Sequence, residues 1–165
     1  MSSACLTLHN TGFTPRGTDR AFSFEGTDLT ARIVASVESL RESETVGRAI
    51  ANRRLALDEA VEECSVPNWD GYGAAPANGL SIEWAGRFLE DLPTSVRDPE
   101  IAIDPQGDVV LDWLLENGHM LSVSISAAGE ISYAMRSPSS KFTGIEPYTD
   151  DIPPRLAEAL APFIR

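Results

Sequence analysis

The segment Asn68-Trp69-Asp70-Gly71-Tyr72-Gly73 combines a carboxylate, a phenol and an indole within six residues. Asp70, Tyr72 and Glu146 could together carry out acid–base chemistry if the fold brings them together, which makes a small enzyme one hypothesis. Trp69 and Tyr72 could equally be anchors for a binding partner. A structural interpretation competes with both, because the glycines permit positive φ and an Asp side chain can accept backbone amides two residues on.

Other catalytic patterns have little support in the sequence. Cys64 falls on the apolar face of an expected helix, where a cysteine is usually inert packing, and His119 lies beside an expected hairpin turn. Neither cysteine has a partner at metal-ligand spacing, and no Gly-x-Ser-x-Gly motif occurs. We therefore predict no catalytic residue, no metal and no cofactor.

Charge is distributed unevenly along the 165 residues, whose net charge is −12. Residues 1–57 contain seven arginines and six acids, whereas residues 58–165 contain six basic residues and 19 acids. The second part has a net charge of −13 and would repel a phosphate backbone, so we expect no direct binding of nucleic acid. An acidic surface instead attracts basic proteins, although acidity can also serve solubility alone.

The periodicity of residues 41–165 predicts one acidic α+β domain. Apolar residues recur at helical spacing over residues 45–64, 81–92 and 152–164. Between residues 101 and 135 they alternate instead, with turn sequences at Asp104–Asp108, Glu116–His119 and Ala128–Glu130. This pattern predicts an antiparallel meander of about four strands packed by three helices, with residues 137–149 as a loop.

Residues 1–40 are predicted to form an N-terminal arm, and the first 20 residues of it are expected to be loose. Residues 21–40 fit two structures: a β-hairpin, or a helix capped by Asp28 with Leu29, Ile33, Val37 and Leu40 on one face. Their β-branched residues favour the hairpin slightly.

The aromatic-glycine segment and several later motifs together resemble a widespread set of small, uncharacterised bacterial and mobile-element proteins. The resemblance covers roughly residues 45–165 and implies a shared fold, but no activity or catalytic residues. Residues 1–40 differ from the short leaders of that group. The motifs are Asn68–Ala74, Phe88–Pro93, Asp104–Trp113, Leu121–Ile125, Gly144–Tyr148 and Asp151–Pro153.

Our first hypothesis is a non-enzymatic module that binds a basic, nucleic-acid-binding protein, in the manner of an antitoxin or anti-defence inhibitor. A self-associating structural module, including a homodimer formed through residues 21–40, is a further alternative to the enzyme. No apolar run is long enough for a membrane span, and residues 1–12 lack signal-peptide features, so we expect a cytoplasmic protein. The predicted binding residues are Trp69, Asp70, Tyr72, Asp104, Asp108, Asp112 and Glu116.

Overall fold

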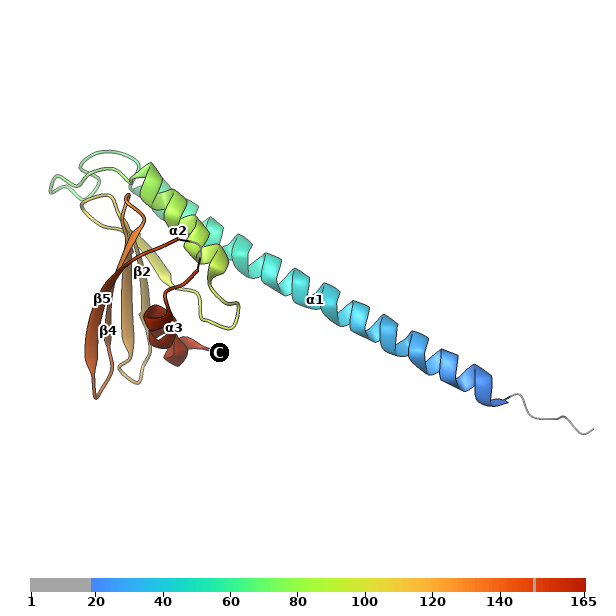
Figure 1. Cartoon of the computed structure of the whole chain (residues 1–165). Coiled ribbons are helices and arrows are strands. Elements are labelled where there is room, and N and C mark those ends of the chain that lie inside the picture. The colour runs from blue at the N-terminus through green and yellow to red at the C-terminus, as the bar shows by residue number, and fades with distance from the viewer. Residues whose placement is uncertain (1–18, 150) are drawn as a thin grey trace, which may run out of the picture. The chain divides into compact units, whose positions relative to one another are not determined.

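A computed structural model describes residues 19–149 and 151–165, with side chains from residue 29 onward. It confirms an α+β fold (Figure 1). Internal contacts divide the chain into two units, which meet between Glu42 and Ser43 and are described separately below. The elements are α1 (Asp19–Glu63), α2 (Gly79–Asp91), β1 (Glu100–Ile103), β2 (Val109–Leu114), β3 (Met120–Ile125), β4 (Glu130–Arg136), β5 (Lys141–Pro147), α3 (Pro154–Leu160) and the 3-10 turn η1 (Ala161–Phe163).

The first unit is helical where it is described, so the expected hairpin over residues 21–40 is wrong. Helix α1 begins at Asp19, which also removes Asp28 as its N-cap. The helical spacing of Leu29, Ile33 and Val37 outweighs the β-branched character of Ile33 and Val37, because the intrinsic helix cost of β-branched residues stays below about 0.7 kcal/mol each. These three side chains are exposed. The rest of the predicted loose arm, residues 1–18, lies outside the described residues.

The sheet of the second unit has five antiparallel strands in the order β1-β2-β3-β4-β5, so each strand pairs with its neighbour in sequence. The predicted meander is thus confirmed, with one strand more than expected. Because successive side chains of a strand point in opposite directions, every second residue lies on the same face of the sheet. Buried residues such as Leu111, Val123 and Ile131 form the covered face, against which α2, α3 and η1 pack.

Strand β5 occupies residues predicted to form a loop, and Tyr133 explains why they pair with β4. Gly144 lies directly opposite Tyr133, and a Cβ at Gly144 would come within 2.3 Å of the tyrosine ring. Two residues further along β5, Glu146 accepts a 2.6 Å hydrogen bond from the Tyr133 hydroxyl. A glycine that looks like a strand breaker in the sequence is therefore the residue that admits the ring.

The opposite side of the sheet, here called the open face, carries the alternate side chains that point away from the core. Its central positions are small and polar, and they are half-buried or exposed. Its larger apolar residues are exposed as well, Leu114 to 75% and Ile145 to 66%. The small central residues are Ser122, Ser124, Ser132, Ala134 and Thr143.

Arg53 joins the helices of the second unit. It falls on the same face of α1 as Leu57, and only 2% of it is exposed. Its guanidinium donates to Asp98 at 2.8 Å, to the carbonyls of Leu89 and Leu92, and to two further carbonyls in the segment after α2. Arg53 therefore satisfies carbonyls at the C-terminus of α2 that the helix itself leaves unpaired.

Candidate functional site

The loop that connects α1 to α2, residues 64–78, is called the connector loop here, and it is held by hydrogen bonds within its own backbone. Asn68 adopts a φ of 63°, and Gly71 and Gly73 adopt 77° and 96°. The Asn68 amide donates to the Ala74 carbonyl at 2.8 Å, and the Gly71 amide donates to the Asn68 carbonyl at 3.0 Å. The left-handed conformations at the two glycines are readily adopted only by residues without a Cβ.

Two side chains complete this loop by accepting backbone amides. Asp70 Oδ1 accepts from Tyr72 at 2.8 Å and from Ala74 at 3.1 Å, while Asn68 Oδ1 accepts from Gly73 at 2.8 Å. The bonds from the Tyr72 and Ala74 amides lower the pKa of Asp70 below its usual value. The enzyme hypothesis needs a carboxyl with a raised pKa, and Asp70 does not meet that requirement.

The two aromatic residues of the loop have opposite environments. Trp69 packs against the core, and its Nε1 donates to the Ala75 carbonyl at 2.9 Å. Tyr72 is 95% exposed. Of the two predicted anchors, Tyr72 has an exposed ring and Trp69 is partly buried.

The loop is also fixed to the turn between β1 and β2. The Ala75 amide donates to the Pro105 carbonyl at 2.9 Å, and the Asn78 amide donates to the Gly107 carbonyl at 2.8 Å. Within this turn, Asp104 Oδ1 accepts the amides of Gln106 and Asp108, each at 2.9 Å. The predicted site residues of the loop and of this turn therefore lie at one end of the sheet.

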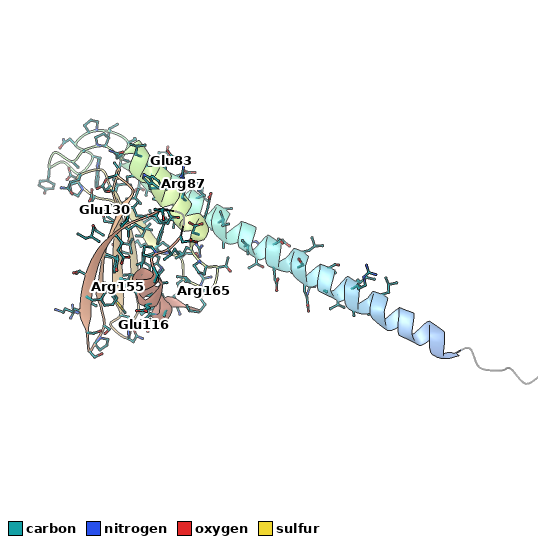
Figure 2. The ribbon with its side chains drawn as sticks, in the orientation of Figure 1. Glu83, Arg87, Glu116, Glu130, Arg155 and Arg165 are labelled. Carbon is teal, nitrogen blue, oxygen red and sulfur yellow. The ribbon has the colours of Figure 1, made fainter. Side chains whose placement is uncertain are left out.

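The remaining predicted residues divide between that end and the rest of the sheet. Asp108 accepts the Ala127 amide of the neighbouring β3–β4 turn, and burial together with the charge of Asp104 raises its pKa. Asp112 lies on the open face, opposite Glu100. Glu116 lies in the β2–β3 turn, at the other end of the sheet from Glu130 (Figure 2). The seven predicted residues thus do not form one site.

Four acids that we did not predict as site residues occur in the last turns of α1. Asp58, Glu59, Glu62 and Glu63 are exposed, and Ala77 ties the connector loop back to this helix by donating to the Cys64 carbonyl at 3.0 Å. The close spacing of these four acids in the sequence was the signal that could have identified them.

We call the surface formed by these helix acids, the connector loop and the β1–β2 and β3–β4 turns the acidic end. Residues 55–86 and 98–135, which supply this surface, contain no lysine or arginine. Arg136 and Lys141 lie opposite each other at the far end of β4 and β5. The two ends of the sheet therefore differ in charge.

The other residues considered for chemistry are buried or hydrogen-bonded within the fold. Burial raises the pKa of the Cys64 thiol, which disfavours the reactive thiolate. Glu146, the third residue of the enzyme hypothesis, accepts the hydrogen bond from the Tyr133 hydroxyl, and burial together with this bond raises the pKa of Tyr133 to about 12. The ring Nδ1 of His119 lies 2.9 Å from the Asn117 side chain.

Within residues 19–149 and 151–165, no three His, Cys, Asp or Glu side chains cluster in a way that could hold a metal ion. None of the described helices combines the length and apolar character needed to cross a membrane. Comparison with known protein families, with curated proteins and with solved structures gives no match, so the resemblance to small bacterial and mobile-element proteins stays a prediction.

Proposed function

We propose that this chain is a non-enzymatic protein-binding module whose acidic end engages a basic partner, with Tyr72 as the central anchor. The observation that carries the proposal is a tyrosine that is 95% exposed on a hydrogen-bonded loop, beside a surface that lacks lysine and arginine. Tyrosine is enriched among the few interface residues that dominate binding energy.

The rigidity of the connector loop supports this role. The backbone amides of Tyr72, Gly73 and Ala74 donate to the Asn68 and Asp70 side chains, and the C-terminal part of the loop is tied to the β1–β2 turn. A loop already held in one conformation loses little entropy on binding, so more of the contact energy becomes affinity.

The charges in the last turns of α1 supply a second argument. Asp58 with Glu62, and Glu59 with Glu63, are like-charged at i,i+4 spacing, an arrangement that destabilises a helix. Acids at a helix C-terminus also oppose the helix dipole, and the last turn of α1 contains no basic residue. A basic partner would relieve both effects.

The partner class follows from this charge. We infer a protein that binds nucleic acid, because carboxylates arranged on a rigid surface can occupy positions otherwise taken by phosphates. Binding would then block nucleic acid, as in an antitoxin or anti-defence inhibitor. Such a complex should form rapidly at low salt and weaken steeply as the ionic strength rises.

The test uses the full chain as bait in an extract of its native cells, followed by affinity measurement on the captured protein. We expect Tyr72→Ala to weaken binding by about 30-fold, the scale of an interface hot spot. Glu62→Lys should weaken it by about tenfold at low salt, mainly through the association rate. Glu116→Lys, with the same charge change at the opposite end, is the matched control and should leave binding unchanged.

Three results would contradict the proposal. The first is a captured partner with an acidic binding surface, and the second is affinity that does not respond to salt. The third is equal binding by the wild type and Tyr72→Ala. Circular dichroism of each variant checks that the fold is intact.

A further inference from the structure

The open face carries two pairs of like charges, one near each edge of the sheet. Glu100 on β1 lies directly opposite Asp112 on β2, and Arg136 on β4 lies directly opposite Lys141 on β5. All four side chains are exposed. Like charges directly opposite each other on neighbouring strands destabilise a sheet. The monomer thus contains two like-charged cross-strand pairs of opposite sign on one surface, and Arg97 and Arg165 line a cavity beside the acidic pair.

These two pairs are complementary to each other. The acidic pair lies between β1 and β2 and the basic pair between β4 and β5, so their centres are three strand spacings, about 14 Å, apart. A two-fold axis in the plane of contact, passing near β3, would place the acidic pair of one molecule over the basic pair of another. The contact would occur twice, since a two-fold interface uses the same surface on both molecules.

We propose that the open face is the interface of a homodimer in which the pair Glu100–Asp112 of each copy meets the pair Arg136–Lys141 of the other. A partner that was only basic would attract the first pair and repel the second, and an acidic partner would do the reverse. A second copy of this chain complements both pairs at once. This inference does not depend on the acidic end as a binding surface.

The shape of the open face suits a packed sheet. Small residues at its centre leave a depression of about 380 Å³ over β3, β4 and β5, with Ser124, Ser132 and Ile145 among its lining residues. Leu114 does not line this depression, and its side chain is exposed. In the dimer, this side chain could pack against the second copy.

The size of the face sets the expected strength of the dimer. Five strands about 4.8 Å apart and about 20 Å long cover roughly 480 Å² per copy. A pair would bury on the order of 1,000 Å², at the lower end of specific interfaces. We therefore expect a dimer with a dissociation constant in the micromolar range that weakens as salt is added.

The first experiment is analytical ultracentrifugation of the full chain over a concentration series at low and high salt. Asp112→Lys and Arg136→Glu should each raise the dissociation constant at low salt by tenfold or more. The same substitutions convert a like-charged cross-strand pair into an oppositely charged pair. The melting temperature of the dilute monomer should therefore rise slightly while dimerisation is lost, a combination that misfolding cannot produce.

The second experiment tests complementarity by mixing two double variants. Glu100→Lys with Asp112→Lys makes both charge pairs basic, and Arg136→Glu with Lys141→Glu makes both charge pairs acidic. Each should be monomeric alone, and an equimolar mixture should form a heterodimer. Glu62→Lys and Arg155→Glu, which make the same kinds of charge change elsewhere, should leave dimerisation unaltered.

A wild-type chain that stays monomeric at a concentration of several hundred micromolar would overturn the proposal. So would a dimer that is insensitive to all the open-face substitutions, because it would have to form through another surface, such as the exposed apolar residues of α1. Loss of partner binding by Tyr72→Ala without any change in dimerisation would separate this interface from the acidic end.

Discussion

The covered and open faces of the sheet are built from the same five strands, yet they use their side chains differently. On β2, Leu111 is fully buried and Leu114 is 75% exposed, although they are only three positions apart. The covered face gains its stability from apolar burial under a layer of helices. The open face contains small residues and unfavourable charge pairs, which suits recognition more than folding. In the proposed dimer, stability and binding would therefore come from opposite faces of one sheet.

The largest expected effect comes from the helix layer above the covered face. Arg53→Met should destabilise the fold by about 4 kcal/mol, because it removes one of the two arginine donors of Asp98 and a donor to four backbone carbonyls, most of which are buried. Arg48→Met on the same helix is the control, since Arg48 is exposed and, among the residues that the structure describes, pairs with Glu44 alone. Urea unfolding measures both, and a cost below 1 kcal/mol for Arg53→Met would show that this network does not hold the helices together.

How far the sequence could reveal this arrangement depends on the type of signal. Alternation over β2, β3 and β4 predicted the covered face correctly, since burial on one side imposes a period of two. Strand β5 was missed, because the space for Tyr133 at Gly144 exists only once the strands pair. The hairpin over residues 21–40 was wrong because a helix extends more easily than it starts, so the turns of α1 that follow support that segment.

The candidate site shows the same limit. The backbone role of Asp70 was among the interpretations of the sequence, since an Asx residue before glycine commonly forms such turns. Arg53 was missed because an arginine is ordinarily assigned to solvent, although its spacing of four from Leu57 placed it on the apolar face. The positions of Asp108, Asp112 and Glu116 on different surfaces could not be predicted without the strand register, which becomes known only from the structure.

A matched pair on β2 compares the two faces directly. Leu111→Ala removes a fully buried side chain and should cost about 3 kcal/mol through lost burial and the cavity that remains. Leu114→Ala makes the same chemical change on the open face and should alter the free energy of unfolding by less than about 0.5 kcal/mol. Chemical denaturation at a concentration where the chain is monomeric gives both values. Equal costs would contradict the division between the faces.

The smallest expected effect is a dependence of stability on acid pH. Burial alone would raise the pKa of Asp98, but hydrogen bonds from Arg53 and Arg165 outweigh it, so the pKa lies below its usual value. The carboxylate therefore contributes stability that is present above a pH of about 3.8 and is lost as the pH falls through the lower, folded-state pKa. Asp98→Asn should remove this part of the pH dependence. A wild type and variant with parallel stability curves between pH 5 and 2 would contradict it.

The strand order β1-β2-β3-β4-β5 also has a kinetic consequence. Each pairing closes a loop of only a few residues, so the entropy lost in forming each hairpin is small and the meander can fold rapidly. Arg53, by contrast, bridges to Asp98 across 45 residues and through a helix. We therefore expect changes in the hairpin turns to alter the folding rate, and changes at Arg53 to alter mainly the unfolding rate. Stopped-flow measurements on Gly118→Ala and Arg53→Met would test this order, in which the strands assemble first and the helices dock afterwards.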